Sequence, residues 1–261
     1  MSADKKYLLA IDNGTQSVRA LVFDLDGQLV AKSQVEIEPF FSDQPGWAEQ
    51  HPHYLWDRLC DACQQLWPQL EFPRTDIEAV ALTTQRATVI NLDKEGQPLR
   101  PAIIWLDQRE QQELPGMGAW GAVLTLAGAG ANVHSFSTQA EANWIAARQP
   151  EIWQRTAKFL LLSGYHSYRL TGRYVDSVAS QVGYLPFDFR RQQWCGPRDW
   201  KWKALPIVRQ QLPELVPAGA ELGRITEQAA RETGIPAGLA LISAGADKAC
   251  EVLGSGCLEP T

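Results

Sequence analysis

The hydrophobic positions of the first 37 residues predict three consecutive strands. An apolar run ends at Asp12, a second follows Asn13-Gly14, and residues 27–37 alternate between apolar and polar side chains. Asn-Gly between two β-prone runs is typical of a hairpin turn, because both residues tolerate a positive φ. Residues 24–27 form the second turn, so we expect an antiparallel three-stranded meander.

Apolar patterns further along the chain predict helices and buried strands. A helix is expected from Pro52, with Pro68 bending or ending it, because apolar residues recur on one face at Leu55, Leu59, Ala62, Leu66 and Leu70. A second helix is expected over 137–148. Continuous apolar runs predict four short buried strands at 77–83, 101–104, 158–163 and 239–243, the third followed by a helix from Tyr165. Residues 118–131 show no clear pattern, and we expect 194–202 to be a surface or lid segment.

Composition narrows the class of protein. The chain has 261 residues, of which 45% are hydrophobic and 21% charged, which is ordinary for a globular protein with a substantial core. A net charge of −6 argues against nucleic acid as a partner. No apolar run is long enough for a transmembrane helix, and residues 1–6 lack a signal-peptide core. We therefore expect no membrane partner and a cytoplasmic location.

The five cysteines do not suggest a disulfide framework. Cys60 and Cys63 form a CxxC with His51 and His53 upstream, so a zinc site is one interpretation. However, there is no second CxxC, and the pair falls inside a helical pattern. Packing within the helix is the favoured interpretation, although the sequence does not define a role for Cys60 and Cys63.

The turn between the first two strands is small and polar. Gly14, Thr15, Gln16 and Ser17 offer backbone N–H groups and hydroxyls, which suit a phosphate group. The carboxylate of Asp12 could hold Mg²⁺ directly or through water. The alternative is a surface hairpin in which Asp12 only caps the turn, and this is the better interpretation for an arbitrary hairpin.

A resemblance to a known protein family favours the phosphate site over the surface hairpin. Asp12-x-Gly14-Thr15-x-Ser17-x-Arg19 resembles the first phosphate motif of the FGGY carbohydrate kinases, and Gly46-Trp47-x-Glu49-x-x-Pro52 resembles another of their loops. The resemblance implies an α/β domain of the ribonuclease-H-like (actin-like ATPase) class, with a mixed sheet that opens with the meander and helices on both faces. It also implies ATP and Mg²⁺, with Asp12 at the metal and with the following residues at the phosphates: Gly14, Thr15, Gln16, Ser17 and Arg19.

Three further segments resemble substrate and catalytic motifs of this family. Residues 84–88 resemble the glycerol kinase segment whose Arg and Glu hold substrate hydroxyls, and Trp105-x-Asp107-x-Arg109 resembles the Trp-x-Asp-x-Arg signature. Residues 245–249 resemble the motif that carries the general base. The resemblance therefore implies Asp247 as the base and, as substrate-binding residues, Arg86, Trp105, Asp107 and Lys248.

Each of these residues also has a structural alternative. Asp247 could be a helix N-cap, Arg86 part of a surface ion pair and Trp105 a core anchor. Asp107 could form a local salt bridge with Arg109. Lys248 could pair with Glu251, three residues further along a helix.

The departures from the family concern the substrate. Ala87 stands where glycerol kinases have Glu, and Lys248 stands where the family has an amide. The Met-His pair of xylulokinases is absent at Arg86-Ala87. We therefore expect a ketose or polyol larger than glycerol. An acidic group on it is one option, since both changes shift the site toward positive charge.

The resemblance runs from Tyr7 to about Gly256, about half the length of such kinases. We expect residues 1–253 to form the N-terminal domain and 254–261 to begin the second domain, which would carry the adenosine site. The expected function is ATP-dependent phosphorylation of a sugar or polyol hydroxyl, with the isolated half inactive and a homo-oligomer as one option. The alternative is a non-kinase ATP-binding or regulatory module of the same superfamily.

Overall fold

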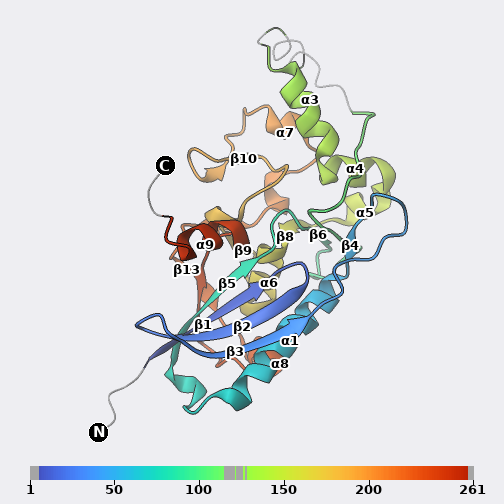
Figure 1. Ribbon diagram of the computed structural model, residues 1–261. Helices are drawn as coiled ribbons and strands as arrows, with labels where there is room; N and C mark the ends of the chain where they lie inside the picture. The colour runs from blue at the N-terminus through green and yellow to red at the C-terminus, as the bar shows by residue number, and fades with distance from the viewer. Residues whose placement is uncertain (1–5, 115–120, 122–125, 127, 258–261) are drawn as a thin grey trace.

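Two sheets organise the molecule, with helices packed around both (Figure 1). The computed structural model describes residues 6–114, 121, 126 and 128–257. The larger sheet has the strand order β13 (Glu221–Arg224), β14 (Ala240–Ser243), β5 (Ile77–Thr84), β1 (Tyr7–Asn13), β2 (Ser17–Asp24), β3 (Leu29–Glu36). Strands β14, β5 and β1 are parallel to one another, whereas the other neighbours are antiparallel. This mixed sheet confirms the predicted fold class and its antiparallel opening.

The first hairpin is present, but its turn is not the expected Asn-Gly turn. Asn13 is the last residue of β1, is fully buried and pairs with Val18 of β2. Neither Asn13 nor Gly14 has a positive φ. The turn is closed by the Gly14 N–H, which donates to the Ser17 carbonyl at 3.0 Å. Asn13 is thus a buried strand residue and not a turn residue, and its side chain forms a buried hydrogen bond with His166.

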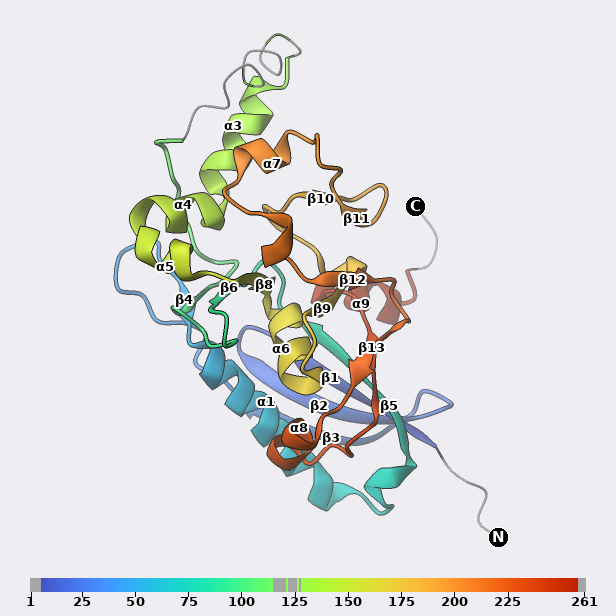
Figure 2. The same ribbon diagram turned by 180° about the vertical axis from the view of Figure 1, so that it is seen from behind.

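Helices cover the larger sheet unequally. The helices α1 (Pro52–Leu66), α6 (Leu162–Thr171) and α8 (Glu227–Thr233) pack on one face, and α9 (Asp247–Gly254) lies over the other face beside β5 (Figures 1 and 2). The covered face follows from the alternation along β1, where Leu9 and Ile11 are buried while Leu8 is 41% exposed. Each fully buried side chain of this kind contributes about 1.5–3 kcal/mol relative to exposure.

Helix α1 has the predicted apolar face and the predicted end. It stops at Leu66, and a 3₁₀ turn, η1 (Trp67–Gln69), contains Pro68, which cannot continue the helical hydrogen bonds. Cys60 and Cys63 are free thiols buried in the core beneath the sheet. Burial raises the pKa of the Cys60 thiol to about 12. Helix packing accounts for both residues, and within the described ranges no group of three His, Cys, Asp or Glu residues could hold a metal.

The smaller sheet lies between two apolar cores. Its order is β4 (Glu49–Gln50), β7 (Ala102–Ile103), β6 (Val89–Leu92), β8 (Lys158–Leu161). Ile90 packs with the core of the larger sheet, whereas Val89 packs with the second core. The predicted strands at 101–104 and 158–163 therefore belong to a different sheet from those at 77–83 and 239–243. The four predicted strands thus belong to two sheets. The sequence does not show this division, because apolar content alone does not specify which strands pair.

The second core supports the upper part of the molecule in Figure 1. The predicted helix at 137–148 is two helices, because the chain turns at Ala140 between α3 and α4. Residues 194–202 include the end of a short strand and the start of a helix, and most of 118–131 lies outside the described residues. The elements of this part are α3 (Gly130–Gln139), α4 (Glu141–Arg148), α5 (Pro150–Arg155), β10 (Phe187–Asp188), β11 (Gln193–Trp194) and α7 (Lys201–Ala204).

The remaining elements are α6 and several short segments. Helix α6 begins at Leu162, three residues earlier than expected and directly after β8. A short parallel pair and three 3₁₀ turns complete the described chain: β9 (Val175–Ser177), β12 (Glu214–Val216), η2 (Arg74–Asp76), η3 (Val178–Ser180) and η4 (Arg209–Gln211). None of the helices in the described part of the chain has the length and hydropathy needed to span a bilayer.

Candidate active site

Three loops meet beyond the carboxyl ends of the parallel strands. The phosphate loop, residues 14–17, follows β1, residues 85–87 follow β5, and residues 244–246 follow β14. The three strands are neighbours in the sheet, and the Thr83 hydroxyl donates to the Gly245 carbonyl at 2.9 Å. This edge is where open α/β sheets bind ligands.

Asp12 lies on the sheet face that carries α9. Its carboxylate accepts from Arg19 Nη1 at 2.9 Å, so Arg19 contacts Asp12. Burial raises the pKa of Asp12; the Arg19 charge opposes this shift, while Asp247 and Glu251 add to it. The acidic groups of β1 and α9 therefore share one neighbourhood. Such a site has an electrostatic reason to take up a cation.

The phosphate loop exposes most of its predicted donors. Thr15 and Gly14 are partly exposed and Gln16 is exposed, whereas Ser17 is buried as the first residue of β2. A Cβ placed on Gly14 would meet only the Ser17 carbonyl oxygen, at 3.5 Å. Packing therefore does not require a glycine at position 14, and the absence of a side chain leaves room for a ligand close to the backbone.

A buried histidine supports this loop from below. His166 Nε2 lies 2.8 Å from Asn13 Oδ1, and Asn13 Nδ2 donates to the Gly14 carbonyl. Because the Asn13 amide uses its N–H there, Oδ1 accepts, and His166 is the neutral Nε2–H tautomer. Burial, together with the nearby Arg169 charge, lowers the pKa of His166 to about 3. Sequence reasoning missed His166, because no local pattern links it to Asn13.

Trp105 is joined to the phosphate loop by hydrogen bonds. Its indole N–H donates to Thr15 Oγ1 at 2.9 Å, and the Thr15 hydroxyl donates to Gln85 Oε1 at 2.9 Å. Gln85 Nε2 in turn donates to Gln50 Oε1 at 2.8 Å. Trp105 is 51% exposed, so it is not the core anchor that was the structural alternative. Its ring is available to a ligand next to the phosphate loop.

A cavity of about 450 Å³ opens beside Trp105. Arg86 is exposed at its wall and forms no ion pair with any residue that the structure describes. Ala87 has φ +51°, a conformation that is uncommon for a residue with a Cβ and is typical of functional sites. Helix α4 and the loop after η3 complete the wall with Glu141 and Tyr184. The cavity is of the size that takes a small polar molecule.

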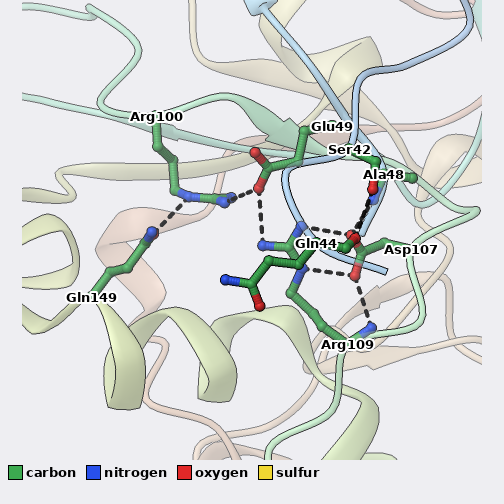
Figure 3. A network of polar contacts seen from close by, with 8 residues as sticks. All are labelled: Ser42, Gln44, Ala48, Glu49, Arg100, Asp107, Arg109 and Gln149. Atoms are coloured by element: carbon green, nitrogen blue, oxygen red, sulfur yellow. Dashed lines mark hydrogen bonds and ion pairs between the residues drawn. The ribbon is translucent and has the colours of Figure 1, made fainter. Parts of the chain in front are cut away.

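Asp107 and Arg109 form part of a buried charge network (Figure 3). Asp107 accepts from the Ala48 N–H and from the Arg109 backbone N–H, Nε and Nη2, which fills both carboxylate oxygens. The two side chains are only 3% and 2% exposed. The structure thus favours the salt-bridge alternative for Asp107 over substrate binding, because no lone pair is left to face a ligand.

The same network fixes the tryptophan loop, residues 104–109. Arg109 Nη1 lies 2.9 Å from Glu49 Oε1, and Glu49 also pairs with Arg100. The Arg109 guanidinium carbon is 4.0 Å from the ring centroid of Trp47 and 4.6 Å from that of Trp144. Two carboxylates and two guanidinium groups therefore hold the loop that presents Trp105.

Asp247 and Lys248 begin α9 in different orientations. Asp247 is partly exposed and is the first helical residue, while Ala246 is the N-cap, so Asp247 is not the cap itself. Lys248 Nζ lies 2.6 Å from Glu251 Oε2 on the exposed side of the helix. This is the contact of the structural alternative, and it pairs the Lys248 charge with a carboxylate of its own helix.

Nearly the whole chain matches a family of known proteins. Residues 7–254 match the profile of the N-terminal domain of the FGGY family of carbohydrate kinases. The chain belongs to this family. This FGGY chain is 29% identical over 255 residues to an uncharacterized sugar kinase of Escherichia coli (strain K12), covering 98% of the chain and 44% of that relative. It is also 29% identical over 231 residues to the glycerol kinase of Delftia acidovorans (strain DSM 14801 / SPH-1), covering 84% of the chain and 45% of that relative.

Solved structures of the family share the fold of this FGGY chain. The xylulose kinase from Rhodospirillum rubrum superposes with a TM-score of 0.79 at 24% identity, over 98% of the chain and 52% of that structure. The Plasmodium falciparum glycerol kinase with ADP gives a TM-score of 0.76 at 20% identity, over 98% and 51%. The chain thus spans about half the length of the relatives that it matches.

Proposed function

We propose that this FGGY chain is the substrate half of an ATP-dependent kinase that phosphorylates a hydroxyl of a sugar or polyol. The observation that carries the proposal is the meeting of the phosphate loop, Trp105 and Asp247 at one edge of the sheet. Residues 1–253 form the N-terminal domain in this proposal, and 254–261 lead into a second domain. Residues 258–261 lie outside the described part.

Each contact at the site has a role in this reaction. Arg86 donates to substrate hydroxyls, and the exposed ring of Trp105 packs against the carbon chain of the substrate. Asp247 accepts the proton of the reacting hydroxyl, whose oxygen forms the new bond to the γ-phosphorus as ADP leaves. The N–H groups of Thr15 and Gln16 hold phosphate oxygens, whereas the Gly14 N–H already donates to the Ser17 carbonyl. The Arg19 charge opposes the rise in the pKa of Asp12 that burial causes.

The residues present fit a magnesium ion shared with phosphate. Mg²⁺ is usually held by one or two carboxylates together with substrate phosphates. Asp12 supplies a carboxylate next to the phosphate loop, with Asp247 and Glu251 adding negative charge nearby. The ion would neutralise charge on the phosphates. ATP as the donor is consistent with the cytoplasmic location, which we retain as part of the proposal.

A non-kinase ATP-binding module is less well supported. Such a module needs the phosphate loop, but it does not need an exposed tryptophan and an unpaired arginine around a cavity. The proposal includes an inactive isolated half, because kinases of this type close a dry site between two domains. Strong kinase activity of residues 1–261 alone would contradict this part.

The decisive experiment uses the full-length gene product. ADP release should be stimulated by at least one sugar or polyol from a broad panel. D247N should lower kcat by at least about 100-fold with KM nearly unchanged, because it removes the basic oxygen while keeping the shape. E227Q is the matched control, since Glu227 begins α8 as Asp247 begins α9, and it should stay within twofold. An active D247N enzyme would refute the proposed base.

A further inference from the structure

One wall of the cavity cannot provide the acidic group that a glycerol-type site places there. Ala87 carries only a methyl group and has a positive φ. A Cβ at Gly183, which faces it, would lie 3.6 Å from the Ala87 Cβ. Neither residue has a polar side-chain atom, so a hydroxylated ligand finds no carboxylate on this side.

Glu141 brings a carboxyl group to the same cavity from another element. It is the first residue of α4, which packs on the second core rather than on the larger sheet. No ion pair and no hydrogen bond to another side chain is formed by Glu141 within the described residues. Burial raises the pKa of Glu141 to about 7, with the Asp107 charge adding to the shift and Arg109 opposing it.

Arg109 does not serve as the counterion of Glu141. Its guanidinium is bonded to Asp107, paired with Glu49 and enclosed by Trp47 and Trp144. The Glu141 carboxyl accepts from its own backbone N–H but from no other side chain. A partly buried carboxyl with acceptor capacity left, on the wall of a cavity, is the type of group that a ligand completes.

We propose that Glu141 accepts hydrogen bonds from substrate hydroxyls and that the cavity therefore selects an uncharged sugar or polyol over a sugar acid. The inference rests on the proposed kinase function and deepens it. Substrate hydroxyls donate to the Glu141 oxygens and restore the hydrogen bonds that burial removed. A sugar acid would instead bring a second carboxylate next to Glu141.

Arg86 could attract the carboxylate of a sugar acid, whereas Glu141 would repel it. Arg86 is exposed, and water and salt screen its attraction for a carboxylate. Glu141 is partly buried, where the effective dielectric constant is lower and repulsion between like charges is larger. Above about pH 7, where Glu141 is ionised, its repulsion of a second carboxylate should therefore exceed the screened attraction to Arg86.

The proposal predicts a specific pH dependence. The groups that face Glu141 are Asp107 and Arg109 from the tryptophan loop and Tyr184, whose pKa Glu141 helps to raise. Arg86 and Glu110 line the same cavity. The ionised carboxylate is the stronger acceptor. Hence KM for the neutral substrate should fall as pH rises through about 7, and this inflection should be absent in E141Q.

The experiment compares neutral and acidic substrates with the full-length gene product. The panel holds glycerol, xylulose, other pentoses, hexoses and alditols, together with gluconate and the matching sugar acids. The best substrate should be neutral. E141Q should lower its kcat/KM by about 10- to 100-fold, mostly through KM, since one hydrogen bond to a charged group is lost. E141D should recover part of this loss, and E151Q, an exposed acid in the first turn of α5, should change it less than twofold.

The outcomes separate the inference from the function on which it rests. If no sugar stimulates ADP release, the proposed function fails. If a neutral sugar is phosphorylated and folded E141Q keeps its KM and the pH inflection, the function stands and the role of Glu141 is refuted. A sugar acid as the best substrate, with E141Q unchanged, also refutes it. Thermal melts of both variants establish that they are folded.

Discussion

The phosphate loop and the tryptophan loop meet at one site, but different contacts hold them in place. The phosphate loop joins two neighbouring strands, β1 and β2, above a core that contains Leu9 and Ile11. The tryptophan loop depends on four buried charged side chains: Glu49, Arg100, Asp107 and Arg109.

This difference decides how each loop responds to change. An apolar core tolerates substitutions that keep its volume, because its contacts are not directional. A buried ion network tolerates the loss of a member poorly, since the remaining charges stay desolvated without a partner. The two loops should therefore fail in different ways when single residues are replaced.

The largest effect is expected from Arg109→Met. The substitution leaves the buried Asp107 and Glu49 carboxylates without their shared cation, so the free energy of unfolding should drop by about 3–5 kcal/mol. Chemical denaturation measures this. Arg191→Met is the control, because Arg191 is 77% exposed in its pair with Asp188 and should change stability by less than about 0.5 kcal/mol. Equal effects of the two substitutions would contradict the comparison.

A smaller effect concerns the support of the phosphate loop. The pKa of His166 is about 3 in the folded chain, against 6.5 for an ordinary histidine, so its stability contribution is complete above pH 6.5 and is lost as pH falls. Between pH 7 and pH 5 the wild type should lose about 2 kcal/mol more than His166→Gln, which does not titrate but can still donate to Asn13. Unfolding at several pH values measures this difference. The same pH slope for both proteins would show that His166 is not held neutral.

The smallest effect on stability is expected from Gly14→Ala in the phosphate loop. Gly14 has no positive φ and its added Cβ has room, so stability should change by less than about 0.5 kcal/mol. If a phosphate approaches this backbone, kcat/KM for ATP in the full-length gene product should nevertheless fall by about 10-fold or more. Gly196→Ala, with no neighbour within 4 Å, is the control for both measurements. Unchanged ATP kinetics in Gly14→Ala would place the phosphate elsewhere.

The sequence predicts the parts of this site that local patterns encode. The meander, the α1 helix and the run ending at Thr84 follow from hydrophobic periodicity, which reports local burial. The family resemblance directs attention to Asp12, Trp105 and Asp247, and the structure places all three near the same sheet edge.

The other parts depend on contacts between distant segments. The second sheet pairs β6 with β8, which follow each other only after about 65 residues, so neither shows which partner it takes. His166 lies 153 residues from Asn13, and Glu141 faces a cavity built from four separate segments. The Asn-Gly pair was misleading because a buried hydrogen bond to Asn13 overrides the local turn preference.

The direct junction between β8 and α6 has a mechanical consequence. Leu161 ends the strand that lies between the two cores, and Leu162 begins the helix that carries His166. No loop residue separates them, and His166 follows Leu162 by roughly one turn, about 6 Å along the helix axis. We therefore expect β8 and α6 to move together as a rigid unit. A rotation of the part built on the second core would then displace His166 and, through its hydrogen bond, Asn13 and the phosphate loop.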